Sequence, residues 1–206
     1  MSEIMTSAWA PRSAWPASPR SGRHGRLQGE PGLRLTFRDG LGLATIVAAD
    51  GQEETLRAIL AERRGWRLPE AGAAALTGER GLVWSAPSQW LAVDESPDTL
   101  RDLPEVLRGV AAVTDQSDGR AIVRVSGANA RAALAKGVTI DLHPRTFRTG
   151  RTAVTSIAHI GAQFWQRDEA PTYDIAVARS FAGSFWAWLG EAAAEFGYEV
   201  SRTRSA

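Results

Sequence analysis

Asp141 and His143 come closest to an acid–base pair in this sequence. They stand two residues apart in Asp141-Leu-His-Pro, and Pro144 favours extended backbone for the residue before it. Side chains two apart on an extended segment point to the same side. An Asp–His pair alone supplies no nucleophile, and no Gly-x-Ser-x-Gly elbow is present. The sequence therefore favours a turn histidine that bonds nearby backbone.

The remaining polar groups do not converge on a site. We place His159 in an apolar strand and interpret it as a structural histidine, and His24 lies in a segment without periodicity. Asp168 and Glu169 are adjacent and diverge on regular structure, which indicates a solvated turn. The short glycine pairs lack the strand–loop–helix context of a nucleotide-binding loop. We therefore predict no catalytic, cofactor-binding or metal-binding residue in this chain.

Tryptophan and arginine point instead to protein contacts. The chain has 8 Trp, and its 24 basic residues include a single lysine, Lys136. Trp and Arg are enriched in interface hot spots, although genome composition is a second explanation for the arginines. Trp186 and Trp188 lie about 200° apart on a helix, so one is exposed unless both pack within two layers. The candidates for partner contact are Trp9, Trp15, Trp186 and Arg145.

Bulk composition excludes several classes of function. Of 206 residues, 44% are hydrophobic and 23% are charged, as in ordinary globular proteins. The net charge of +1 gives no basic field for nucleic acid or an anionic membrane. Cysteine is absent, which removes disulfides and thiol chemistry and fits a reducing compartment. No apolar run approaches the roughly 20 residues of a membrane span, and no secretory signal opens the chain, so we expect a cytoplasmic protein.

Residues 1–32 differ in composition from the rest of the chain. They hold four of the ten prolines and show no periodicity, so we expect no core there. Three interpretations are open: a flexible tail, an arm anchored on a partner by its two indoles, and a transit peptide. The acid-free stretch between Ile4 and Gly29 resembles a transit peptide in composition, but its prolines weaken the helix that such a peptide needs.

Periodic patterns predict a succession of strands and helices from Leu33 onward. The predicted strands are 33–37, 41–48 (joined to the first by an Asp39-Gly40 turn), 82–85, 89–93, 110–114, 120–125, 173–177, and a long strand or hairpin over 152–165. The predicted helices run from a cap at Asp50 to Gly65, over 98–107, over 128–136, and from a cap at Ser180 to Phe196.

This order of strand, strand and helix repeats about four times. It predicts an α+β protein in which mostly antiparallel sheets are covered by helices. We expect a flexible N-terminal arm over residues 1–32, a folded domain over 33–197 and a C-terminal tail over 198–206. The domain admits a division into two halves near residue 109.

Seven short motifs follow one another along the chain. They are Gly65-Trp-Arg-Leu-Pro69, Trp84…Pro87-Ser-Gln-Trp90-Leu, Asp115-x-Ser-x-Gly-Arg120, Ser126-Gly-x-x-Ala130-x-x-x-Leu134-Ala-Lys-Gly137, Asp141-Leu-His-Pro144-Arg145-x-Phe147, Ala170-Pro-Thr-Tyr-Asp174 and Ala178-Arg-Ser-Phe181…Trp186-x-Trp188-Leu. Each is weak by itself, and their shared order carries the resemblance. From about residue 33 to 197 the chain resembles the gamma subunit of heterotetrameric sarcosine oxidase, a family distantly related to folate-binding aminomethyltransferases.

The resemblance implies a fold like the folate-binding part of aminomethyltransferases and a noncatalytic, structural role. The implied partners are the alpha, beta and delta subunits of a cytoplasmic complex. That complex oxidatively demethylates sarcosine to glycine, yields hydrogen peroxide from oxygen, and passes the carbon to tetrahydrofolate as methylenetetrahydrofolate. The resemblance assigns the flavins, FAD and FMN, to beta, NAD and folate to alpha and zinc to delta, with no cofactor in gamma.

One position departs from the folate-binding relatives. They often have histidine after Asp-x-Ser, where this chain has Asp118, and no residue here matches their catalytic aspartate. The alternative function is a free-standing folate-dependent aminomethyl- or methyltransferase. It would need a pocket between two halves and a carboxylate to order the folate amine, for which Asp115 and Asp141 are the candidates.

Overall fold

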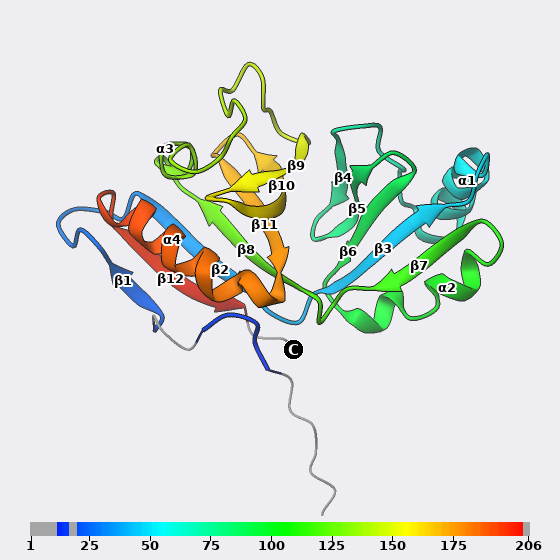
Figure 1. The fold of residues 1–206 in the computed structure, drawn as a ribbon, viewed down its shortest axis with the longest axis horizontal. Helices are drawn as coiled ribbons and strands as arrows, with labels where there is room; N and C mark the ends of the chain where they lie inside the picture. Colours follow the sequence, from blue (N-terminus) through cyan, green and yellow to red (C-terminus); the bar gives the residue numbers. More distant parts are fainter. Residues whose placement is uncertain (1–11, 17–19, 204–206) are drawn as a thin grey trace, which may run out of the picture.

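Two β-sheets stand side by side, and each carries helices on the face turned away from the other sheet (Figure 1). The structure is a computed structural model, and it describes residues 12–16 and 20–203. Each sheet therefore has one face against its own helices and one face toward the other sheet.

The larger sheet has seven strands in the order β1-β12-β2-β8-β11-β10-β9, and the β12–β2 pair is its parallel one. Its strands are β1 (Gly22–His24), β2 (Leu33–Arg38), β8 (Arg120–Ser126), β9 (Thr152–Ile157), β10 (Ile160–Asp168), β11 (Thr172–Ala178) and β12 (Tyr198–Thr203). Its helices are α3 (Ala130–Leu134), the 3-10 turn η2 (Arg179–Phe181) and α4 (Ala182–Ala194).

The smaller sheet has five antiparallel strands in the order β4-β5-β6-β3-β7. Its strands are β3 (Gly42–Ala48), β4 (Ala74–Thr77), β5 (Arg80–Ala86), β6 (Gln89–Asp94) and β7 (Ala111–Asp115). Its helices are α1 (Glu53–Arg64), the 3-10 turn η1 (Pro97–Leu100) and α2 (Leu103–Val106). All of these elements come from one stretch of chain between β2 and β8.

The predicted α+β class, with mostly antiparallel sheets covered by helices, is confirmed, but the connections differ from the predicted ones. β2 and β3 do not form a hairpin around Asp39-Gly40, because β2 pairs with β8 in the other sheet. The smaller sheet is thus an insertion into the larger one, and a division near residue 109 would fall inside it. Alternation shows which residues share a face, but it does not show which strand lies alongside.

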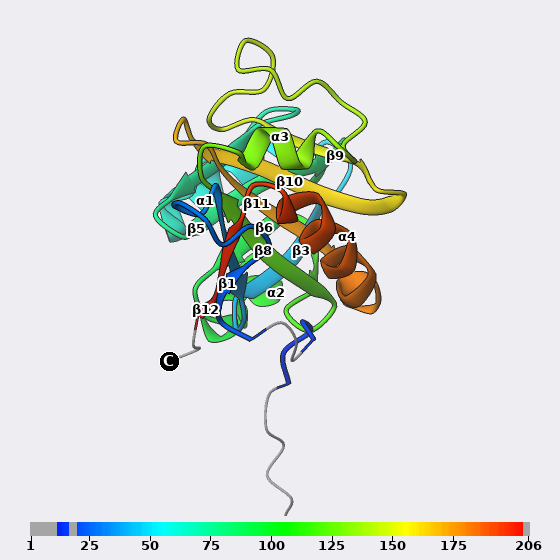
Figure 2. The ribbon, with the colours of Figure 1, turned by 90° about the vertical axis from the view of Figure 1, so that its left-hand side faces the viewer.

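Both ends of the described chain add strands to the larger sheet (Figure 2). β12 lies between β1 and β2, with Tyr198 opposite Leu33 and Val200 opposite Leu35. The prediction of an arm over 1–32 is therefore wrong for β1, and the prediction of a tail over 198–206 is wrong for β12. Tyr198 and Val200 alternate into the core, but two apolar residues are too few to predict a strand by pattern.

The predicted glycine at the end of α1 is correct, but the predicted N-cap residues of α1 and α4 are not. α1 ends at Gly65, whose left-handed φ of 65° closes the helix as predicted. It begins after Gln52 and not at Asp50, and no side chain caps it. α4 begins after Phe181, since Ser180 lies in the preceding turn η2. None of the helices in the described ranges has the length and apolar character to cross a membrane.

Three apolar clusters hold the layers together. The first lies between the larger sheet and the helices α3 and α4, and it includes Phe37 and Phe185. The second lies between the smaller sheet and its helices, around Ile46 and Leu60. The third joins the two sheets and is described next because it occupies the place where the alternative function needs a pocket.

Candidate functional site

The contact between the two sheets is closely packed and apolar. Leu43 and Leu91 of the smaller sheet belong to one buried cluster with Ile122 and Trp165 of the larger sheet. Each of these four side chains is at most 2% exposed. A folate pocket between the two sheets would have to open this contact.

Hydrogen bonds add to the contact between the sheets. The buried Gln163 side chain on β10 donates to the Trp84 carbonyl of β5 at 3.0 Å. Near the start of β4, the Ala74 amide donates to the Gly150 carbonyl at 2.7 Å. The two sheets are therefore joined through their backbones as well as their side chains.

A cluster of five charged side chains, which we call the Glu79 cluster, also spans the two sheets. Glu79 lies in the β4–β5 turn, and the other members, Arg38, Arg124, Arg167 and Asp174, lie on four strands of the larger sheet. Arg124 donates to Glu79 at 2.8 Å and to Asp174 at 2.7 Å. Arg38 donates to Glu79 at 2.9 Å, and Arg167 donates to Asp174 at 3.1 Å. Three guanidinium groups thus hold two carboxylates.

The electrostatics of this cluster favour the charged forms. Burial opposes the ionisation of Glu79, but hydrogen bonds and charges from Arg124 and Arg38 outweigh burial and lower its pKa from 4.5 to about 2. Burial acts to lower the pKa of Arg124, yet the bonds to Asp174 and Glu79 raise it above its ordinary value. Glu79 is therefore a fixed anion near neutral pH and is poorly matched to general acid catalysis.

Two of the tryptophans predicted to contact a partner lie inside the fold. Trp15 is 4% exposed, stacks on Phe37 at 4.8 Å, and donates its indole N–H to the Ile122 carbonyl at 3.1 Å. Trp186 meets the same phenyl ring edge-on at 5.1 Å. Both indoles therefore contact this chain's own core. Trp9 lies outside the described residues.

Trp188 is half-buried and packs against the same cluster as Trp186. Its ring centroid lies 5.6 Å from that of Phe185, and its indole covers Gly137 so closely that a Cβ there would clash. Both tryptophans of α4 therefore pack within the two-layer fold, the second of the two outcomes that the sequence allowed.

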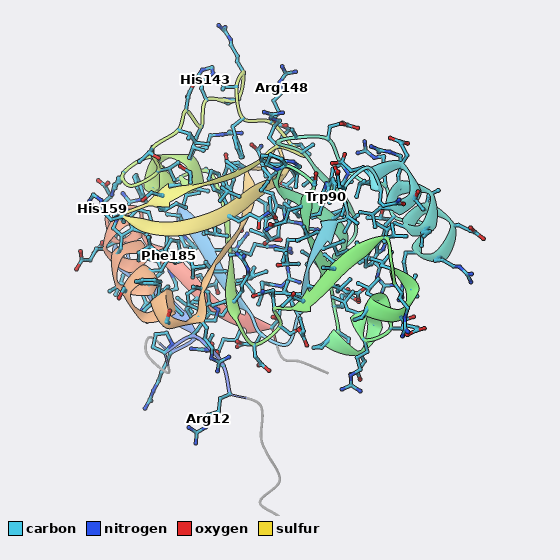
Figure 3. The ribbon with its side chains drawn as sticks, turned by 45° about the vertical axis from the view of Figure 1, so that its right-hand side comes forward. Arg12, Trp90, His143, Arg148, His159 and Phe185 are labelled. Carbon is cyan, nitrogen blue, oxygen red and sulfur yellow. The ribbon has the colours of Figure 1, made fainter. Side chains whose placement is uncertain are left out.

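Arg145, the remaining candidate for partner contact, is exposed on the surface. It lies in the loop between α3 and β9, whose outer end carries His143 and Arg148 (Figure 3). The Asp141 carboxylate accepts hydrogen bonds from the His143 amide at 2.8 Å and the Thr146 hydroxyl at 3.0 Å. These bonds lower the pKa of Asp141. His143 Nδ1 accepts from the Arg145 amide at 3.2 Å, so His143 has the turn role that the sequence favoured.

The other titratable candidates are spread over the molecule. His159 is exposed in the β9–β10 turn, with a φ of 66°, and does not lie in an apolar strand as predicted. The hydrophobic pattern over 152–165 left one long strand or a hairpin open, and the structure has a hairpin of β9 and β10 with His159 in its turn. Asp115 ends β7 of the smaller sheet and accepts from the Ser117 amide at 2.8 Å, whereas Asp141 lies in a loop beside the larger sheet. The structure therefore does not bring Asp115 and Asp141 together.

Within residues 12–16 and 20–203, no three His, Asp or Glu side chains gather as metal ligands would. A cavity of about 220 Å³ lies beside the smaller sheet, lined by residues 65–67, 74–77, 80 and 81. None of the candidates named from the sequence lines it.

The Glu79 cluster was not predicted from the sequence. Arg124 and Asp174 each stand between buried apolar residues of a strand, which is a signal for a second, polar face of the sheet. That signal shows where the side chains point, but it does not show that Glu79, from a distant turn, meets them.

Comparisons with known proteins give a consistent result. Residues 48–195 match the sarcosine oxidase, gamma subunit family. The chain is 31% identical over 166 residues to sarcosine oxidase subunit gamma of Corynebacterium sp. strain U-96, and the match covers 79% of this chain and 78% of that protein.

Two solved structures are similar to this one. A chain of the heterotetrameric sarcosine oxidase from Corynebacterium sp. U-96, in complex with pyrrole 2-carboxylate, matches with a TM-score of 0.74 at 30% identity over 82% of this chain and 87% of that chain. Aminomethyltransferase T of the glycine cleavage system from Bartonella henselae matches with a TM-score of 0.57 at 14% identity, over 84% of this chain and 48% of that chain. The second match confirms the predicted aminomethyltransferase-like fold. The chain belongs to the sarcosine oxidase gamma subunit family.

Proposed function

We propose that this chain is a noncatalytic, structural subunit of a heterotetrameric sarcosine oxidase. The observation that carries the proposal is family membership over residues 48–195. In this proposal the partners are alpha, beta and delta subunits, and the cytoplasmic complex oxidatively demethylates sarcosine to glycine. FAD, FMN, NAD, tetrahydrofolate and zinc would bind those other subunits.

The packing of the molecule supports a structural role. The sheets meet through an apolar cluster and through ion pairs between three arginines and two carboxylates. A carboxylate with a pKa near 2 between two arginines is suited to fixing two sheets relative to each other. A body held in this way can keep other polypeptides in register without contacting a substrate.

Co-expression tests the proposal directly. The chain is produced with the other three subunits, and the same complex is produced without it. We expect a stoichiometric four-subunit complex that oxidises sarcosine, and an unstable or inactive assembly when this chain is omitted. The isolated chain should bind no flavin and oxidise no sarcosine. Full activity of a stable complex that lacks the chain would contradict the proposal.

Titration calorimetry separates this function from the folate-dependent alternative. The isolated chain is titrated with tetrahydrofolate, and we expect no saturable heat. Micromolar binding that is lost on Asp115→Asn or Asp141→Asn would favour the transferase and overturn the structural role.

A further inference from the structure

The loop between α3 and β9 carries several exposed basic side chains. We call residues 141–151 the arginine loop. It carries His143, Arg145, Arg148 and Arg151, all exposed, and no acidic residue after Asp141. Figure 3 shows His143 and Arg148 pointing away from the body of the molecule.

The backbone of the arginine loop is held from the inside. Leu142 and Phe147 are buried, and Phe147 stacks on Phe164 at 5.0 Å. The Asp141 carboxylate bonds the first turn of the loop, and the Gly150 amide donates to the Gln166 carbonyl at 2.9 Å. The loop is therefore preorganised, which lowers the conformational entropy lost when a partner binds.

The arginines of the loop have no carboxylate partner in the described part of the chain. No ion pair joins Arg145, Arg148 or Arg151 to any described Asp or Glu. The nearby carboxylates are occupied, since Asp141 bonds its own loop and Glu169 accepts from Thr149 at 2.7 Å. The guanidinium groups are therefore free for carboxylates on another molecule, whose geometry they match.

Two exposed apolar side chains lie at the base of the loop. Ile140 is 37% exposed and Val154, on the edge strand β9, is 56% exposed. The Thr139 and Thr155 hydroxyls, one residue from each, are 2.9 Å apart, so the segments that carry Ile140 and Val154 adjoin. An apolar centre beside charged residues is the usual composition of a protein–protein interface.

We propose that the arginine loop, with Ile140 and Val154, docks on an acidic surface of a partner polypeptide. This inference rests on the proposed function and names the surface of this chain that the complex uses. The chemistry favours a protein over a nucleic acid. Nucleic-acid affinity comes mainly from many phosphate contacts, whereas this chain has a net charge of +1 and places apolar side chains beside three arginines.

The test reverses the charge of the loop in the complete four-subunit complex. Full-length chains carrying Arg145→Glu, Arg148→Glu or both are compared with wild type and with Arg63→Glu, which matches each single reversal in charge. Arg63 is a matched control because it is also exposed and forms no ion pair with a described carboxylate, but it lies on α1 beside the smaller sheet. Association with the other three subunits is measured by biolayer interferometry at 50 and 300 mM NaCl. A melting curve and a circular dichroism spectrum of each variant show that it is folded.

We expect the double reversal to weaken association about a hundredfold at 50 mM NaCl and to reduce its salt dependence, with Arg63→Glu close to wild type. Val154→Asp should weaken association as well, without changing the melting curve. Equal affinity and equal salt dependence for the folded double reversal and wild type would overturn the inference and leave the proposed function standing. Failure of wild-type chain to associate would overturn the proposed function itself. Binding of wild type to duplex DNA in preference to the subunits would overturn the choice of a protein partner.

Discussion

Phe37 joins segments that are far apart in the chain. Its ring is stacked by Trp15 at 4.8 Å, met edge-on by Trp186 at 5.1 Å, and covered by the Arg202 guanidinium at 4.6 Å. Aromatic pairs of this kind contribute about 0.5–1.5 kcal/mol each beyond the burial of their area. Trp15 therefore belongs to the core, although it lies in a proline-rich segment that resembles a tail.

Replacement of Trp15 tests this assignment at the level of one residue. Trp15→Ala should lower the free energy of unfolding by about 3–5 kcal/mol, because it leaves a cavity beside Phe37 and removes the hydrogen bond to the Ile122 carbonyl. Trp15→Phe should recover part of the loss, since it keeps the stacking. Urea unfolding measures both, and the exposed Leu27→Ala serves as the control, expected within about 0.5 kcal/mol of wild type. Equal stability of Trp15→Ala and wild type would place this indole outside the core.

The β4–β5 hairpin belongs to the smaller sheet, but a charged side chain in its turn contacts the larger sheet. Its turn places Glu79 among Arg38, Arg124 and Arg167 of the larger sheet. The carboxylate is partly buried, so its loss would leave the buried Arg38 guanidinium without its ion-pair partner, which destabilises the fold. The hairpin is therefore more than a surface loop of the smaller sheet.

Lowering the pH should weaken the contact between Glu79 and the arginines of the larger sheet. The pKa of Glu79 is lowered from 4.5 to about 2 in the folded chain, so its stabilising contribution is complete above pH 4.5 and is lost as pH falls toward 2. The full size of the shift corresponds to about 3 kcal/mol, and solvent screening of the partly exposed carboxylate reduces its contribution to about 1–2 kcal/mol. Glu79→Gln should remove about that amount at pH 7 and flatten the pH dependence of stability between 4.5 and 2.

Urea unfolding at several pH values measures this effect, with Glu62→Gln as the matched control. Glu62 is exposed on α1 and forms no ion pair with a described basic side chain. Its replacement should leave both the stability and the pH dependence close to wild type. A pH dependence of Glu79→Gln as steep as that of wild type would show that the Glu79 cluster does not link the sheets.

The whole molecule is built as one sheet inserted into another. The chain leaves the larger sheet after β2, builds the smaller sheet, and returns at β8, which pairs with β2. The apolar cluster around Trp165 and Leu91 then joins the two sheets. Because the sheets share a core and two chain crossings, we expect them to unfold together.

Cooperative unfolding is a prediction about the whole chain. Urea titration followed by two-dimensional NMR should give the same midpoint for amides of β6 and of β11. Trp165→Ala removes a side chain that is 1% exposed and lies between the sheets. It should lower the free energy of unfolding by about 3–5 kcal/mol and shift both midpoints to lower urea concentration together. Two separate midpoints in wild type would show that the sheets are independent domains.

The sequence by itself determined the local structure and the class of fold. The strand faces around Leu35 and Ile175 and the helix end at Gly65 were predictable, because alternation, helical period and left-handed glycine depend on neighbouring residues alone. The turn role of His143 was predictable for the same reason, since Pro144 and Asp141 lie beside it. The order of motifs also indicated the family that the comparisons show.

Only the tertiary structure decided which strands pair and which polar groups meet. The parallel pairing of β12 with β2, the burial of Trp15 and the meeting of Glu79 with Arg124 all join residues far apart in the chain. Period-two alternation is the same whichever strand lies alongside, and a charged residue on a strand carries no information about its distant partner. These contacts arise from packing of the two sheets, and packing depends on the whole chain at once.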